Sequence, residues 1–166
     1  MKKKLAILGF GQEGKSLLKF LRRSPKFKGS KIDILDKKNN KGYLSRVSSF
    51  DLVFRSPGVP YNLPELKSAR KRGVEFSSGT KIFFEEYGGK IIGITGTKGK
   101  GTTSTLLYKI LRAAGKKVLL AGNIGKPAID FLKSGEKYDW AILELSSFQL
   151  QDLDISPNLA VILDVF

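Results

Sequence analysis

The chain contains no cysteine and no histidine, and these two absences limit its chemistry. Without cysteine there are no disulfides, no zinc–thiolate sites and no cysteine nucleophiles. Without histidine, the most common general base of enzymes is missing. Reactions that depend on either side chain being supplied by this chain are therefore excluded.

Long apolar runs are also missing from the sequence. No run approaches the roughly 20 residues that span a membrane, and the apolar stretch at residues 5–9 is too short for a signal peptide. We therefore expect a cytoplasmic location and no membrane insertion. The hydrophobic share of 41% is enough for a packed core, so a folded chain is expected.

Acidic residues are scarce relative to basic ones, with 15 Asp and Glu against 30 Lys and Arg and a net charge of +15. Such an excess favours anionic partners, either nucleic acid or phosphorylated small molecules. A lysine-rich solvated surface explains it equally well. Because the basic residues are scattered and form no stripe with aromatics, no specific nucleic-acid partner is predicted. A nucleic-acid-binding module stays an alternative, and a steep salt dependence of DNA binding would support it.

Short apolar runs alternate with helical patterns, which predicts an α/β fold with mainly parallel sheets. Strands are expected at residues 5–8, 31–35, 52–54, 74–76, 91–95, 118–121, 140–145 and 159–165. Helices are expected at residues 14–23, 64–72, 81–87, 102–114 and 127–133. Gly88-Gly89 interrupts the alternation, so two domains are predicted, residues 1–88 and 89–166. A parallel strand needs both faces covered, and the last predicted strand ends the chain, so the second domain is expected to be incomplete.

The segment GITGTKGKGTT (residues 93–103) lies between a predicted strand and a predicted helix. Glycines there let backbone N–H groups turn toward phosphate oxygens, and the helix adds its positive end. Lys100 can reach the outer phosphates. Ile94 and Gly101 depart from the general phosphate-loop pattern, and Thr102 is predicted to supply the hydroxyl for Mg²⁺ in place of residue 101. The predicted nucleotide-binding residues are Thr97, Lys98, Gly99, Lys100, Gly101, Thr102 and Thr103. The alternative is a glycine-rich turn that opens an ordinary helix.

The segment GFGQEG (residues 9–14) directly follows the first predicted strand, and Asp36 comes 22 positions after Gly14. This spacing matches the dinucleotide-binding fingerprint. The pattern leaves three possibilities open: a nicotinamide or flavin cofactor, another nucleotide diphosphate, or a tight turn without a ligand.

Three further candidate residues lie at the ends of predicted strands or directly after them. Glu144 ends an apolar strand, and the carboxyl ends of strands in α/β sheets open on the ligand crevice. A carboxylate there can hold Mg²⁺ on bound ATP, although a solvated glutamate is the alternative. Asn123 in GNIG offers an amide that donates and accepts. Ser56 lies in the turn RSPGVP, which either contacts a ligand or is a plain turn.

Taken together, GFGQEG, SPGV, GITGTKGKGTT, GNIG, ELSSFQL and AVILDV occur in the order found in the Mur ligases, and the chain resembles that family over essentially its whole length. The resemblance implies a Rossmann-like UDP-sugar-binding domain followed by a truncated P-loop-type ATPase domain, with ATP and Mg²⁺ as cofactors. The implied substrate-binding residues are Gln12, Glu13, Asp36, Lys37, Ser56 and Asn123. The implied catalytic residues are Lys100 and Glu144, and the implied metal ligands are Thr102 and Glu144.

The resemblance also implies a reaction, the ADP-forming addition of D-glutamate to UDP-N-acetylmuramoyl-L-alanine in peptidoglycan synthesis. Such phosphoryl transfer needs charge neutralisation and positioning more than a protein nucleophile. The family continues past the last strand to further metal ligands and a C-terminal domain, so we expect this chain to bind ligands without completing the reaction unless that domain acts in trans. Asp164 stands where the family usually has Asn. The alternatives are another Mur or folylpolyglutamate-type ligase and an NAD(P)-dependent oxidoreductase, which would bind NADH rather than UDP.

Overall fold

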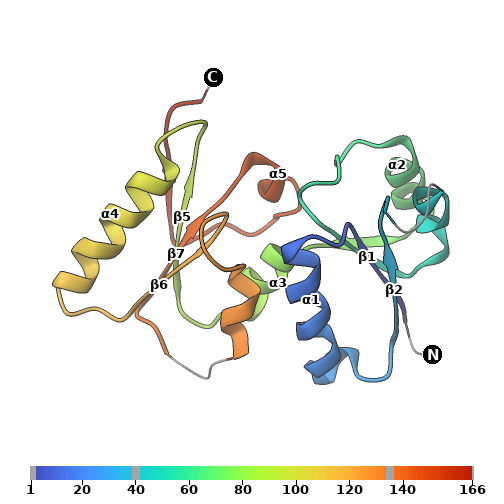
Figure 1. Ribbon diagram of the computed structural model, residues 1–166, viewed down its shortest axis with the longest axis horizontal. Coiled ribbons are helices and arrows are strands. Elements are labelled where there is room, and N and C mark those ends of the chain that lie inside the picture. The colour runs from blue at the N-terminus through green and yellow to red at the C-terminus, as the bar shows by residue number, and fades with distance from the viewer. Residues whose placement is uncertain (1–2, 39–41, 134–136, 166) are drawn as a thin grey trace. The chain divides into compact units, whose positions relative to one another are not determined.

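The computed structural model describes residues 3–38, 42–133 and 137–165 (Figure 1). The chain forms two compact units, Met1–Gly79 and Thr80–Phe166, and each contains its own four-stranded sheet. All paired strands within each sheet run parallel. The predicted α/β fold with two parallel sheets is confirmed.

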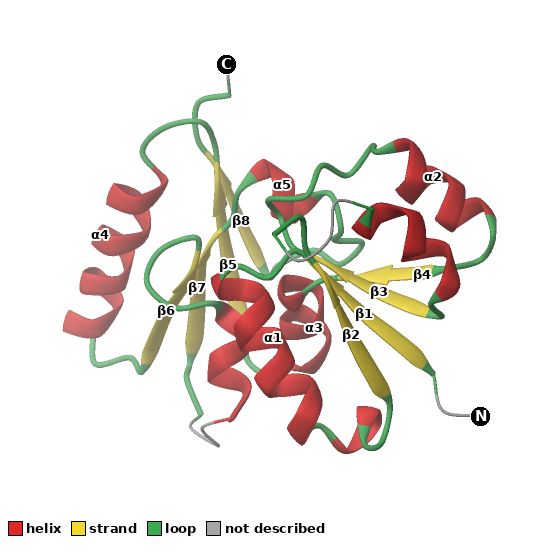
Figure 2. Ribbon diagram, turned by 45° about the vertical axis from the view of Figure 1, so that its right-hand side comes forward, coloured by secondary structure: helices red, strands yellow, loops and turns green. Residues whose placement is uncertain are grey.

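The first unit places β1 between β2 and β3, in the strand order β2-β1-β3-β4 (Figure 2). Its elements are β1 (Lys4–Leu8), α1 (Gln12–Arg23), β2 (Lys31–Leu35), β3 (Leu52–Arg55), α2 (Pro64–Lys71) and β4 (Glu75–Ser77), with 3₁₀ turns at Pro25–Phe27 and Tyr43–Ser49. The chain moves outward from β1 to β2 and then returns to β3 on the other side of β1. In sheets of this kind the ligand crevice lies outside the carboxyl ends of the strands at such a reversal, here β1 and β3.

Helix α1 packs closely on the first unit's sheet. Leu17 and Leu21 of this helix are buried, whereas Leu18 is only partly buried. The approach is closest at Gly14, where a Cβ would lie 2.5 Å from the carbonyl oxygen of Gly9. Only glycine allows this separation, which is the role that the last glycine of the GxGxxG pattern has in helix–strand packing.

Replacing Gly14 with alanine is expected to destabilise the first unit by about 1–3 kcal/mol, because the added methyl forces the helix and the turn apart. Urea unfolding by circular dichroism, together with faster hydrogen exchange of the β1 amides, measures the effect. Gly58→Ala is the control, since a Cβ there meets nothing within 4 Å. An equal loss of stability in Gly14→Ala and Gly58→Ala would contradict the close packing inferred at Gly14.

The second unit has the strand order β6-β7-β5-β8. Its elements are α3 (Gly79–Glu86), β5 (Lys90–Thr95), α4 (Lys100–Ala113), β6 (Val118–Gly122), β7 (Trp140–Glu144), α5 (Ser147–Leu150) and β8 (Leu159–Ile162). The predicted helix at residues 127–133 is a 3₁₀ helix, Ala128–Lys133, the form that short helical pieces often take. Because β5 lies between β7 and β8, the loop that follows β5 is flanked by the ends of both strands.

The division between the units falls after Gly79 rather than at Gly88-Gly89. Helix α3 accounts for this position, because its buried Phe83 and Phe84 belong to the same apolar cluster as Ile91 of β5 and Leu143 of β7. The paired glycines therefore lie inside the second unit, in the connection between α3 and β5.

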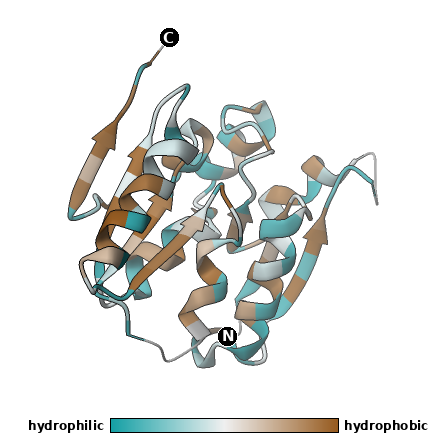
Figure 3. Cartoon of the chain, turned by 60° about the vertical axis from the view of Figure 1, so that its left-hand side comes forward, coloured by the Kyte–Doolittle hydropathy of each residue, from teal (hydrophilic) through white to brown (hydrophobic). Residues whose placement is uncertain are grey.

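Several large apolar side chains of the second unit are exposed. On α4, Leu107 and Leu111 pack on the sheet, whereas Leu106 and Ile110 are 57% and 54% exposed. The edge strand β8 ends at Ile162, three residues before the expected end, and Ile162 is 70% exposed. Much of β8 and of α4 is brown in Figure 3.

No helix in the described ranges is long and apolar enough to cross a membrane.

Candidate functional site

The backbone conformation of the loop between β5 and α4 requires glycine at two positions. Gly96 has φ +142° and its Cβ would lie 2.7 Å from Cβ of Leu163, while Gly99 has φ +81° and caps α4. Non-glycine residues rarely adopt these conformations. The helix begins at Lys100, two residues earlier than predicted, so its N-terminal N–H groups open directly on the loop. Such N–H groups and the helix dipole favour an anion at this position.

Lys100 folds back over the loop. Its Nζ donates hydrogen bonds to the carbonyl oxygens of Gly96 at 2.7 Å and Thr97 at 3.3 Å. The ammonium is thereby placed at the loop that phosphate oxygens would enter, which is where a phosphate-binding lysine is required. Of the other predicted loop residues, Thr97, Lys98, Gly99 and Thr102 are exposed and Thr103 is partly buried.

The residues directly after β8 hold the same loop. The N–H of Leu163 donates to the carbonyl oxygen of Thr95 at 2.9 Å, and the N–H of Thr97 donates to the carbonyl oxygen of Asp164 at 2.7 Å. Asp164 therefore acts on the loop through its main chain. Sequence reasoning missed this role, because backbone hydrogen bonds leave no side-chain signal.

Glu144 ends β7, the neighbour of β5, and is 7% exposed. Asn123, after β6, binds it twice: Asn123 Nδ2 donates to Glu144 Oε1 at 3.1 Å, and the backbone N–H of Asn123 donates to the carbonyl oxygen of Glu144 at 2.8 Å. A Cβ at Gly101 would lie 3.3 Å from Glu144 Oε2. The fold therefore brings Asn123, Glu144 and the first turn of α4 together.

The environment of Glu144 suits a cation. Within the described part of the chain, its carboxylate contacts an amide and no Lys or Arg side chain lies within ion-pair distance. A buried carboxylate without a positive partner is costly. Its oxygens are the ligand type that Mg²⁺ prefers. Glu144 and the adjoining loop therefore fit a magnesium-bound nucleotide, although no cluster of three or more acidic residues is present in the described ranges.

The segment after Glu144 is fixed by a capping box that sequence reasoning did not identify. Ser146 caps α5, its Oγ accepting from the N–H of Gln149, while Gln149 Oε1 accepts from the N–H of Ser146 at 2.9 Å. Gln149 is 3% exposed. The pattern Ser-x-x-Gln at residues 146–149 is the sequence signal that predicts such a cap.

In the first unit, the GFGQEG turn and the SPGV turn meet at the switch point between β1 and β3. Ser56 Oγ donates to the carbonyl oxygen of Gly9 at 2.7 Å, and Gly9 itself has φ +86°. Gln12 and Glu13 are the first two residues of α1. The structure therefore brings Ser56 to the same turn as Gln12 and Glu13, at the position where such folds bind nucleotides.

Asp36 anchors the glycine-rich turn. Its Oδ2 accepts from the N–H of Phe10 at 2.7 Å and its Oδ1 from the N–H of Lys38 at 2.9 Å. These two N–H groups, Lys38 first, hold the pKa of Asp36 below its usual value. Asp36 is thus an ionised residue that shapes the turn, while its neighbour Lys37 is exposed.

Arg55, which sequence reasoning took only as part of a turn, is almost fully buried. Its guanidinium donates to the carbonyl oxygen of Val59 and lies 5.4 Å from the ring centre of Tyr61. Arg70 lies 3.9 Å from the same ring. These contacts close the turn that carries Ser56, so Arg55 positions that turn.

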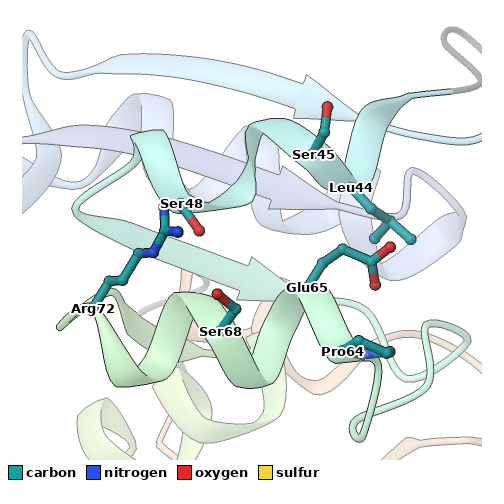
Figure 4. Close-up of a pocket in the computed structure, with 7 residues that line it drawn as sticks. All are labelled: Leu44, Ser45, Ser48, Pro64, Glu65, Ser68 and Arg72. Atoms are coloured by element: carbon teal, nitrogen blue, oxygen red, sulfur yellow. The ribbon is translucent and has the colours of Figure 1, made fainter.

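A separate cavity of about 390 Å³ lies between the 3₁₀ helix Tyr43–Ser49 and α2 (Figure 4). It is lined by Leu44, Ser45, Ser48, Pro64, Glu65, Ser68 and Arg72. None of the predicted site residues is among them.

Comparison with known proteins finds related sequences for both units of the chain. Residues 94–165 match the family model for the Mur ligase middle domain. A protein of Acetivibrio thermocellus is 36% identical, and the match covers 98% of this chain and 38% of that protein. A protein of Symbiobacterium thermophilum is 44% identical, and the match covers 75% of this chain and 27% of that protein. Both are named UDP-N-acetylmuramoylalanine–D-glutamate ligase. This chain thus spans less than two fifths of the length of these relatives.

Solved structures give weaker matches. UDP-N-acetylmuramate:L-alanyl-gamma-D-glutamyl-meso-diaminopimelate ligase from Neisseria meningitides has a TM-score of 0.49 and 16% identity, over 100% of this chain and 61% of its own. UDP-N-acetylmuramate-alanine ligase from Thermotoga maritima has a TM-score of 0.43 and 22% identity, over 96% and 41%. The assignment rests on the sequence matches, which extend across both units. The chain belongs to the Mur ligase family.

Proposed function

We propose that this chain carries the UDP-sugar-binding and ATP-binding parts of an ADP-forming ligase that adds D-glutamate to UDP-N-acetylmuramoyl-L-alanine in peptidoglycan synthesis. One observation carries the proposal: Lys100 and the first turn of α4 lie with Glu144 and Asn123 at the carboxyl ends of neighbouring strands. The choice of D-glutamate follows the names of the relatives.

The second unit supplies the nucleotide site of this proposal. Bound ATP would provide the phosphoryl group that activates the substrate carboxylate, with Mg²⁺ neutralising charge on the phosphates. Lys100 and the N–H groups at the start of α4 orient the phosphates. Glu144 holds the cation, and Asn123 fixes the Glu144 carboxylate and offers its amide to the sugar substrate.

The first unit supplies the UDP-sugar site. The N–H groups at the start of α1, with Gln12 and Glu13, lie where a diphosphate binds in this fold. Ser56 contributes a hydroxyl to the same turn. Asp36 and Lys37, which directly follow β2, would contact the uracil, and Asp36 also holds the turn by accepting from the N–H of Phe10.

Calorimetric titration of three ligands tests the proposal. UDP-N-acetylmuramoyl-L-alanine and ATP with Mg²⁺ are expected to bind, each to its own site, and NADH is expected not to bind. NADH binding in place of the UDP sugar would instead support an oxidoreductase, because the GxGxxG turn followed by an acidic residue also fits that cofactor.

Replacing Glu144 with glutamine is expected to weaken ADP binding about tenfold in Mg²⁺ and to leave it unchanged in EDTA. Glutamine keeps the shape and an oxygen for Asn123 but removes the charge, and a charge-assisted contact contributes about 1.5–3 kcal/mol. Glu85→Gln is the matched control, because Glu85 is exposed on α3. If the variant lost the same affinity with and without metal, Glu144 would not be the cation ligand.

A further inference from the structure

We infer that the cation site beside the phosphate loop lacks one hydroxyl ligand, and that a serine at position 101 would supply it. This inference rests on the proposed function, since it concerns the Mg²⁺ of the bound nucleotide. In general phosphate loops the residue after the lysine is Ser or Thr, and its hydroxyl binds Mg²⁺. Here that residue is Gly101.

The geometry at Gly101 identifies the direction of the missing side chain. A Cβ built there points at the Glu144 carboxylate, 3.3 Å from Oε2, with Cδ1 of Ile124 3.9 Å away. Gly101 is the second residue of α4 and does not have a positive φ. Any L-residue can therefore adopt its backbone conformation, and a small side chain needs only a slight shift of the Glu144 carboxylate.

Two nearby residues of α4, Thr102 and Ser104, also carry hydroxyls. Thr102, which the sequence predicts as the replacement ligand, lies about 100° further around the helix and is exposed. Ser104, one turn from Gly101, is fully buried and its Oγ donates to the carbonyl oxygen of Gly101 at 3.2 Å. A serine at position 101 would instead lie on the side of α4 that faces the Glu144 carboxylate.

A cation at this site would therefore be held by Glu144 and the nucleotide phosphates, and water would take the place of the serine hydroxyl that other phosphate loops supply. Mg²⁺ tolerates this arrangement, because it binds few protein oxygens and keeps several waters. The consequence is a nucleotide affinity that depends less on Mg²⁺ than it would with a hydroxyl at position 101.

Substitution of Gly101 by serine tests the inference as a gain of binding. The Gly101→Ser chain is expected to bind ADP in Mg²⁺ about tenfold more tightly than the unmodified chain, a difference of about 1.4 kcal/mol. In Mn²⁺ and ADP, its water-proton relaxation enhancement is expected to fall, because the hydroxyl displaces one coordinated water. In EDTA its ADP affinity is expected to equal that of Gly101→Ala.

Gly101→Ala is the matched control, because alanine also replaces the glycine in the helix and adds the same Cβ, but it carries no hydroxyl. Combining Gly101→Ser with Glu144→Gln is expected to remove the gain. The inference is overturned, and the proposed function stands, if the unmodified chain binds ADP with Mg²⁺ but Gly101→Ser has the same ADP affinity as Gly101→Ala. The same holds if both variants bind ADP more tightly by an equal factor with and without metal. If neither the unmodified chain nor Gly101→Ser binds ADP under any condition, the nucleotide assignment fails and the inference fails with it.

Discussion

Replacing Lys100 with alanine is expected to weaken ATP binding by at least tenfold and to leave UDP-sugar binding unchanged. The substitution removes the ammonium that lies over the loop, and a charge-assisted phosphate contact contributes about 1.5–3 kcal/mol. Calorimetry with each ligand in turn measures the two affinities on the same sample.

Lys109→Ala is the control for this experiment. Lys109 is an exposed lysine on the same helix, so its loss changes the net charge equally without touching the loop. A similar fall in ATP affinity in both variants would show that general electrostatic attraction, rather than the Lys100 contact, determines binding. Equal loss of both ligands in Lys100→Ala would contradict the assignment of the two ligands to different units.

Replacing Gly122 with alanine is expected to destabilise the second unit by about 3 kcal/mol, from backbone strain together with overpacking. Gly122 has φ +106°, and a Cβ there would lie 2.3 Å from the carbonyl oxygen of Glu144. Relief of this clash requires β6 and β7 to separate at the point where Asn123 binds Glu144. Nucleotide affinity in Mg²⁺ is therefore expected to fall together with stability.

Urea unfolding followed by the fluorescence of Trp140 measures this effect. Trp140 is the only tryptophan of the chain and lies at the start of β7, so its signal reports on the second unit. Gly88→Ala is the matched control, because Gly88 has no positive φ and a Cβ there meets nothing within 4 Å. Coinciding unfolding curves for Gly122→Ala and Gly88→Ala would contradict the expected clash.

The strands were predictable because buried parallel strands are nearly continuous apolar runs. Residues 5–8 and 91–95, for example, lie within one residue of the observed β1 and β5. The domain boundary could not be placed as well from the sequence. Paired glycines mark a flexible connection, but they do not reveal which sheet covers the apolar face of α3, and Phe83 packs on the second unit.

The candidate site was predictable where residues follow strands, since parallel strands bring their carboxyl ends to one edge. Glu144 and Asn123 were found in this way, and the structure joins them by a hydrogen bond. The supports of the site were not predictable. Leu163 and Asp164 hold the phosphate loop through backbone hydrogen bonds, which no side chain reveals. Arg55 is buried only by the folded turn around it, so the sequence alone does not distinguish it from a surface arginine.

The hydrogen bonds that Lys100 makes with its own loop also affect the thermodynamics of nucleotide binding. The Lys100 ammonium is not hydrogen-bonded to water alone, because it donates to the carbonyl oxygens of Gly96 and Thr97. Phosphate binding is therefore an exchange, in which these carbonyls return to water as the ammonium turns to the ligand. The binding enthalpy that calorimetry records is then smaller than a count of contacts in the complex suggests. In return, these hydrogen bonds hold the Lys100 side chain at the loop, so less of its conformational entropy is lost on association.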